Sequence, residues 1–89
     1  MARVELDPRE LDKNLQIEDG IRRSLDEDPV ASVDRTEIES NYVLLDSNGV
    51  IIEGTVDQKC QQINTKLQTT CTQTEDRIIF VRPRWDRTN

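Results

Sequence analysis

A chain of 89 residues is long enough for one small domain, and its charged residues (34%) are as abundant as its hydrophobic ones, so the core must be lean. The sequence has no histidine, which removes the most common general base and metal ligand, and its three glycines are too scattered to form a phosphate-binding loop. We therefore expect a protein without catalytic activity, cofactor or bound metal.

No hydrophobic stretch approaches the roughly 20 residues of a membrane-spanning helix, so we expect no membrane association. The two cysteines, Cys60 and Cys71, are too few for a disulfide framework and point to a reducing compartment. Together these features predict a cytoplasmic protein.

The charge is distributed unevenly along the chain. Residues 1–40 contain 12 acidic and 6 basic residues, whereas residues 41–89 contain 6 of each, which together give the net charge of −6. An asymmetry of this kind usually reflects the binding partner rather than the fold.

The first predicted element is a helix over about residues 8–25. Asp7 is a suitable N-cap, and Pro8 fits the first helical position. Gly20 lies on the solvent side of this helix, where it weakens the helix by about 1 kcal/mol without ending it. The apolar residues recur at helical spacing and form one face, which we expect to pack on a partner or on the rest of the chain. This face comprises Leu11, Leu15, Ile17, Ile21 and Leu25.

Residues 26–40 show no apolar period, and Pro29 disfavours helix just before it. We interpret this segment as an acidic linker or a loosely held extended stretch. Asp26-Glu27-Asp28 belongs to it and lacks the further ligands of a calcium loop.

Two apolar runs, residues 42–45 and 50–52, flank the turn sequence Asp46-Ser47-Asn48-Gly49. Asn-Gly supplies the positive φ angles that tight hairpin turns require, so the pattern predicts a β-hairpin.

A second helix is predicted after Thr55, which can cap it. We expect this helix to fray beyond Leu67, because the following threonines have poor helix propensity. Both cysteines are expected on this helix, about 16 Å apart, which is too far for a disulfide. The apolar stripe that should cover a sheet consists of Val56, Cys60, Ile63, Leu67 and Cys71.

The run Ile78-Ile79-Phe80-Val81 predicts a third strand, central in its sheet, connected to the hairpin by a right-handed crossover. The predicted fold is therefore α+β with the order α-β-β-α-β: a three-stranded mixed sheet, one helix packed on a face, and an amphipathic N-terminal helix. The expected divisions are an acidic helical segment (1–25), an acidic linker (26–40), a hairpin-helix-strand core (41–83) and a basic, aromatic tail (84–89).

This element order resembles that of the roadblock adaptor family. The resemblance is carried by residues 42–54, around the Asp-Ser-Asn-Gly turn, and by residues 74–81. The crossover is shorter than in that family, and the family's last two strands and final helix have no counterpart here. The resemblance implies an adaptor-like protein that dimerises.

The functional hypotheses concern three surfaces, the first helix, an exposed strand edge and the tail, through which the protein would associate with another protein or with a second copy of itself. We expect a non-enzymatic protein-binding subunit, adaptor or inhibitor, because Trp and Arg are enriched at protein interfaces. The alternative is a nucleic-acid-linked regulator, which would use the acidic half as a DNA mimic or the tail as a phosphate grip. A third reading is that Trp85 folds back over the core while the arginines pair with the acidic half. The candidate partner-binding residues are Leu11, Leu15, Ile21, Leu25, Arg82, Arg84, Trp85 and Arg87.

Overall fold

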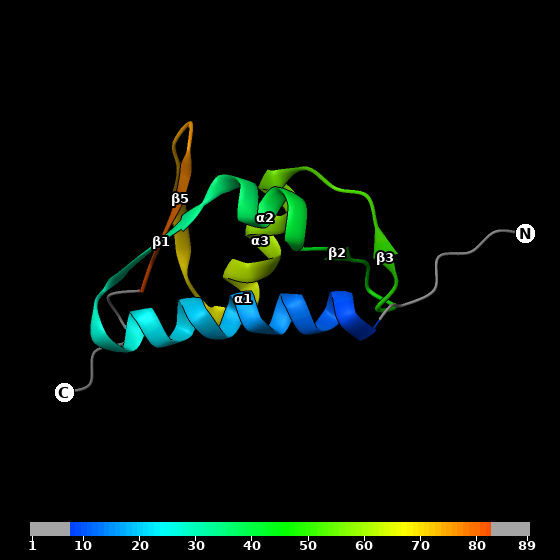
Figure 1. Ribbon diagram of the computed structural model, residues 1–89, viewed down its shortest axis with the longest axis horizontal. Coiled ribbons are helices and arrows are strands. Elements are labelled where there is room, and N and C mark those ends of the chain that lie inside the picture. Colours follow the sequence, from blue (N-terminus) through cyan, green and yellow to red (C-terminus); the bar gives the residue numbers. More distant parts are fainter. Residues whose placement is uncertain (1–7, 83–89) are drawn as a thin grey trace, which may run out of the picture.

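The computed structural model describes residues 8–82, which form a small α+β domain (Figure 1). The elements follow in the order α1 (Pro8–Glu27), β1 (Val30–Asp34), α2 (Arg35–Asn41), β2 (Leu44–Leu45), β3 (Ile51–Ile52), α3 (Val56–Leu67), β4 (Thr70–Gln73) and β5 (Arg77–Val81). The α+β class predicted from the sequence is confirmed. The predicted N-cap of the first helix, Asp7, lies outside the described residues.

The main sheet has three strands in the order β1-β5-β4, and all its neighbours are antiparallel. The central position predicted for the strand at residues 78–81 is confirmed. The prediction of a mixed sheet with a parallel crossover is wrong, because β5 pairs with β1 and β4 rather than with the hairpin. Three residues, 74–76, join β4 to β5, and the Thr74 amide donates to the Arg77 carbonyl at 2.8 Å. The predicted hairpin forms, but as a separate two-stranded sheet, β2-β3.

Most of the segment predicted as a linker, residues 26–40, is helix or strand. It holds β1 and the first six residues of α2. Three of its four apolar side chains face inward, since Ala31 and Ile38 belong to the core and Val33 packs against it, whereas Val30 is 46% exposed. Long-range pairing with β5 supplies the order that local periodicity does not reveal.

The helix α3 ends at Leu67, as the threonine content suggested, but the chain does not continue as a fraying helix. Gln68 adopts a left-handed conformation (φ 59°) at the C-cap, and Thr69 bonds back to Asn64 through both its amide and its hydroxyl. The chain then reverses into β4. At its start, Thr55 and Gln58 form a reciprocal capping box.

The two cysteines therefore do not share a helix. Cys60 lies on α3 and Cys71 on β4, and Cys71 packs against the core cluster that contains Cys60. Both thiols are free. Burial raises the pKa of the Cys60 thiol to about 12, and the neighbouring Cys71 thiol contributes to the shift. The expected separation of about 16 Å, based on an unbroken helix, is wrong.

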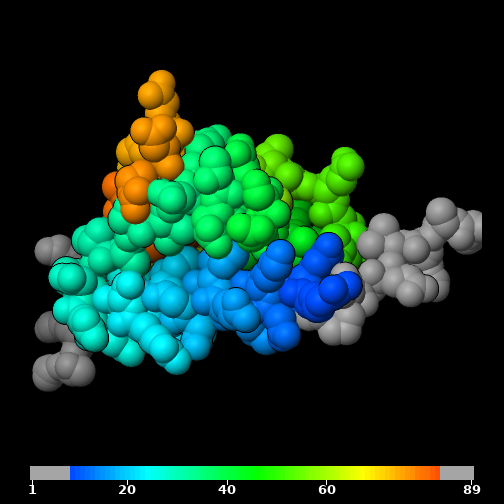
Figure 2. All heavy atoms as spheres, viewed as in Figure 1, coloured from blue at the N-terminus to red at the C-terminus, as the bar shows by residue number. Residues whose placement is uncertain are grey.

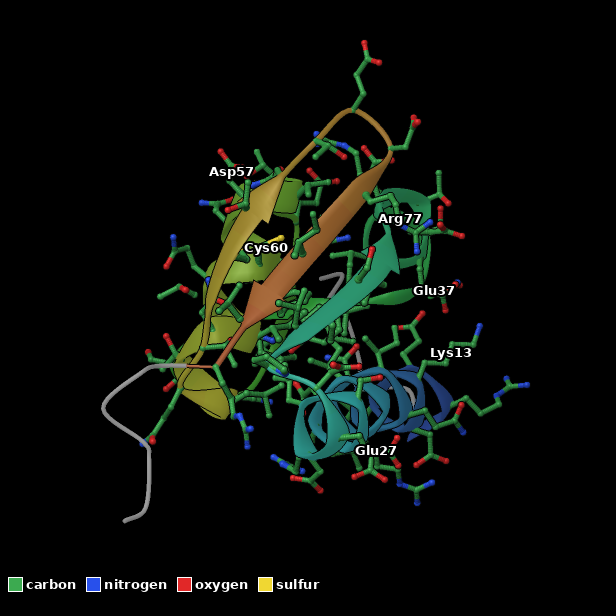
Figure 3. The ribbon with its side chains drawn as sticks, turned by 90° about the vertical axis from the view of Figure 1, so that its left-hand side faces the viewer. Lys13, Glu27, Glu37, Asp57, Cys60 and Arg77 are labelled. Atoms are coloured by element: carbon green, nitrogen blue, oxygen red, sulfur yellow. The ribbon has the colours of Figure 1, made fainter. Side chains whose placement is uncertain are left out.

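The core lies between the main sheet and the helices. Ile78 and Phe80 alternate on the covered face of β5, whereas Ile79 and Val81 lie on the other face. Figure 3 shows that second face toward the viewer, with α3 behind the strands and α1 along the lower side. The largest fully buried side chains are those of Tyr42, Phe80, Ile38, Ile63, Ile78 and Cys60.

The first helix packs in cis, beneath the rest of the domain (Figure 1). It extends two residues beyond the predicted end and continues without a break through Gly20. Its buried face differs from the one predicted, because Leu15 is 61% exposed whereas Asn14 and Glu18 are buried. The two polar residues find hydrogen-bond partners inside the domain, and a count of apolar residues cannot anticipate this.

Candidate binding groove

A groove of about 680 Å³ lies between α1 and the segment formed by β1 and α2. In Figure 1, β1 begins close to the C-terminal end of α1 and runs upward to α2. The helix α1 and the strand β1 therefore diverge from the short connection at Asp28–Pro29. Figure 2 shows the same face, with the surface of α1 below and that of β1 and α2 above. We call this feature the α1–β1 groove.

The floor of the α1–β1 groove is apolar. Ile17 and Ile21 contribute from α1, and Ala31 and Val33 contribute from β1. Of these four, Ile21 and Ala31 are buried and the other two are half-buried. A ligand in the groove would therefore contact apolar side chains that are already held in place by the core.

The rim of the groove is charged. Lys13 lines it from α1 and Glu37 from α2, and both side chains are exposed. Figure 3 shows the two residues on the same side of the molecule. Asp34 and Arg77 also line it, but they pair with each other at 2.8 Å between Oδ1 and Nη1. Within residues 8–82, neither Lys13 nor Glu37 has an ion-pair partner, so these two charges are available to a ligand.

One edge of β1 faces this groove without a strand partner. The other edge of β1 pairs with β5. Two backbone hydrogen bonds lie just beyond the ends of this ladder, from Arg82 N–H to Pro29 O (3.1 Å) and from Arg35 N–H to Asp76 O (2.8 Å), and both involve odd-numbered residues on the β1 side. Bonding residues alternate in an antiparallel ladder, so the odd-numbered residues of β1 bond to β5. The even-numbered residues direct their amides and carbonyls away from β5. Among the described residues, nothing bonds to the backbone of Ser32, which lines the groove.

Gly20 widens the groove on the α1 side. It lines the groove, and a Cβ atom built on it would meet no atom within 4 Å. The absence of a side chain here therefore leaves open space beside β1.

A buried polar network fixes the position of α1 relative to the rest of the domain. The Asn14 side chain both donates to the Val43 carbonyl (3.0 Å) and accepts from the Val43 amide (2.9 Å). One turn later, Glu18 accepts a hydrogen bond from the Tyr42 hydroxyl and lies 3.4 Å from Lys66 Nζ. Both buried polar side chains of α1 thus bond to residues outside the helix, which fixes the helix and with it one wall of the groove.

The predicted partner-binding residues fall into three groups. Ile21 and Leu25 are only 3% and 4% exposed and contact the domain's own core, whereas Leu15 is exposed and Leu11 half-buried. Arg82 is exposed at the end of β5. The structure brings none of these into one exposed patch, and only Ile21 lines the groove. Arg84, Trp85 and Arg87 lie outside the described residues.

Sequence reasoning missed the residues that build the groove, above all Ser32, Val33 and Glu37. The available signal was the alternation of Ala31, Ser32 and Val33, which has the period of a half-buried strand. It is too short to stand out beside the acidic residues around it.

Outside the groove, Val50 and Ile52 are exposed on the β2-β3 hairpin. In the part of the chain that the structure describes, no three His, Cys, Asp or Glu side chains are grouped so that they could hold a metal ion. None of the described helices is long and apolar enough to cross a membrane. Compared with protein-family models, with curated proteins and with solved structures, the chain gives no match.

Proposed function

We propose that this protein is a non-enzymatic protein-binding subunit, adaptor or inhibitor, and that its contact surface is the α1–β1 groove. The observation that carries the proposal is the unpaired edge of β1 inside an apolar groove with a charged rim. Unpaired strand edges are natural docking sites for other chains, and natural proteins usually protect them with proline, lysine or a bulge. Pro29 precedes β1 and Asp34 ends it, but Val30–Val33 between them carry no proline, lysine or bulge.

The remaining features of the groove support the same function. Its walls are anchored by the core and by the polar network of Asn14 and Glu18. A preformed site of this kind avoids much of the ordering cost of association.

The test uses a displayed library of random 12-residue peptides selected on the full chain. Binding of the selected peptides is then measured by fluorescence anisotropy on the wild type, on Gly20→Trp and on Gly20→Ala. We expect Gly20→Trp to weaken binding at least tenfold, because the indole would fill the groove. Gly20→Ala is the matched control and should bind as the wild type does, since its methyl group occupies little of the space. Selected peptides that bind equally to Gly20→Trp, or a selection that yields none, would refute the groove as the contact surface.

The alternative function, nucleic-acid mimicry or binding, rests on the basic tail and on the acidic half of the sequence. The tail residues lie outside the described part of the chain, and no observation on the described residues favours this alternative. It stays a prediction, and a steep loss of affinity with increasing salt would support it.

A further inference from the structure

We infer that the α1–β1 groove binds an extended peptide segment as a fourth strand of the main sheet, paired to the free edge of β1. This inference rests on the proposed function and specifies the ligand and its mode of binding. The known sheet order β1-β5-β4 would become a four-stranded sheet with the ligand strand outside β1.

The backbone of β1 defines how such a strand would bond. Ser32 presents both its amide and its carbonyl to the groove, so one ligand residue can exchange two hydrogen bonds with it. Asp34 occupies the N-cap position of α2, where its carbonyl accepts the first helical bond, which leaves its amide for the ligand. The five residues of β1 span about 17 Å, so a ligand strand of about five residues matches its length.

The side chains of β1 define what the ligand should carry. In a sheet, directly opposed residues point to the same face. Ligand residues opposite Ala31 and Val33 would therefore point to the inner side, where Ile17 and Ile21 form the floor of the groove. The ligand residue opposite Ser32 would point to the solvent-exposed face. The preferred segment thus has apolar side chains two positions apart with a polar residue between them.

The rim adds a charge preference. Lys13 on one wall and Glu37 on the other have no ion-pair partner within residues 8–82, and both are exposed. A segment that carries one acidic and one basic side chain outside the apolar pair would satisfy both. Rim charges of this kind contribute more to selectivity and association rate than to affinity.

A single strand fits the groove better than a second copy of the domain does. The helix α1 flanks the free edge, so a second β1 would bring its own α1 into the same space (Figure 1). Between residues 8 and 27 the helix carries six acidic and four basic side chains, so two such helices placed together would repel each other weakly. A peptide segment brings neither obstacle.

The decisive variant is Ser32→Pro. Proline removes the amide that faces the groove but leaves every hydrogen bond from β1 to β5 in place, because those bonds come from the odd-numbered residues. The matched control is Ser32→Ala, which keeps the amide and loses the hydroxyl that accepts from Arg77 Nε. Circular dichroism and the thermal midpoint establish that each variant is folded.

The probe is the tightest groove-dependent peptide from the selection described above. We expect Ser32→Pro to weaken its binding at least tenfold and Ser32→Ala to change it less than threefold. If Ser32→Pro fails to fold, amide hydrogen exchange on the wild type decides, since the Ser32 amide should become at least tenfold more protected when the peptide is bound.

The results separate this inference from the proposed function. Strand pairing would be overturned, and the groove kept as the binding surface, by the following result: peptide binding is lost in Gly20→Trp but unchanged in Ser32→Pro, and the Ser32 amide gains no protection from exchange. A chain that sediments as a dimer in the wild type and as a monomer in Ser32→Pro would overturn the peptide ligand in favour of a second copy.

Discussion

The hydroxyl of Tyr42 donates a hydrogen bond to Oε2 of Glu18, and this contact joins two residues that are only 1% and 5% exposed. Tyr42 follows directly after α2 as its C-cap, while Glu18 lies in the middle of α1. Gln62 Nε2 donates to the same hydroxyl at 3.1 Å, and Lys66 Nζ lies 3.4 Å from the same carboxylate oxygen. Three helices therefore meet at one buried polar cluster, which carries charge but leaves no described member without a partner.

Replacing Tyr42 with Phe should lower the free energy of unfolding by about 1–3 kcal/mol. The substitution keeps the ring but removes the donor, so the Glu18 carboxylate loses one of its hydrogen bonds in a buried setting. Urea denaturation followed by circular dichroism measures the change. Leu15→Ala is the control, because Leu15 is exposed on the same helix and its truncation should change stability by less than about 0.5 kcal/mol. An unchanged denaturation midpoint in Tyr42→Phe would show that the cluster does not hold α1 in place.

The stability of the domain should decrease as the pH rises above about 9. Burial, with a hydrogen bond to Glu18, raises the pKa of Tyr42 above its usual value of 10, and burial raises that of Cys60 from 9 to about 12. A raised folded-state pKa means that the folded protein keeps a proton which the unfolded chain releases. The stabilisation from each group is thus complete below its unfolded pKa and is lost as the pH rises through the folded value.

Urea midpoints measured between pH 7 and 11 test this dependence. The decrease should begin near pH 9, where an unfolded cysteine ionises, and should be smaller in Cys60→Ala. Tyr42→Phe should remove the part that begins near pH 10. A midpoint that stays constant to pH 11 would contradict the raised values.

Much of the local structure could be predicted from the sequence, because it depends on neighbouring residues. The helix at residues 8–27, the hairpin turn at Asn48-Gly49 and the central strand at 77–81 each have a strong local pattern. In the hairpin, Gly49 has the positive φ (81°) expected of it, but Asn48 does not, so only half of the turn geometry indicated by the Asn-Gly pair forms.

The sheet could not be predicted, because its pairings are long-range. The strand β1 pairs with β5, nearly fifty residues away, and only two of its side chains point to the core. The strand β4 is Thr-Cys-Thr-Gln, and because Cys71 continues the apolar stripe of α3, the sequence alone indicates the fraying end of a helix there. The left-handed C-cap at Gln68, a residue with no special preference for that conformation, is what separates the two.

The groove was missed for the same reason. It lies where α1, β1 and α2 diverge, and two of these three elements fall in the predicted linker. The assumption that apolar residues alone define the buried face of α1 also hid the inward positions of Asn14 and Glu18.

Gly54→Ala should destabilise the domain by about 1–3 kcal/mol, which is typical of overpacking. A Cβ atom at this position would overlap the terminal methyl of Leu44 and lie 3.3 Å from its Cβ, and Leu44 is buried. Thermal denaturation measures the effect. The double variant Gly54→Ala/Leu44→Ala should lose less stability than the sum of the two single changes, because the smaller side chain makes room. Additive losses would indicate that the contact is not the cause.

The two cysteines should differ in reactivity toward a thiol reagent. Cys60 is buried with a raised pKa and should react slowly at neutral pH, while the partly exposed Cys71 should react faster. Mass spectrometry of the labelled, digested protein measures both rates, and in urea the two should converge. Faster labelling of Cys60 than of Cys71 in the folded protein would contradict the placement of α3 against β4.

Aspartate placed at Ile21 and at Leu15 should have opposite consequences, although both residues belong to the apolar face predicted from the sequence. Ile21→Asp places a carboxylate in the core, where it finds no partner, so the loss should exceed about 3 kcal/mol and prevent cooperative folding. Leu15→Asp places the same group on an exposed position and should change stability by less than about 0.5 kcal/mol. Circular dichroism and urea denaturation of the two variants provide the comparison. If instead Leu15→Asp unfolds the chain, α1 packs through the face that the sequence predicted. The α1 residues described as lining the α1–β1 groove would then be wrong. If Leu15→Asp folds normally but no longer binds the groove-selected peptides, the contact surface extends around α1 to its exposed side.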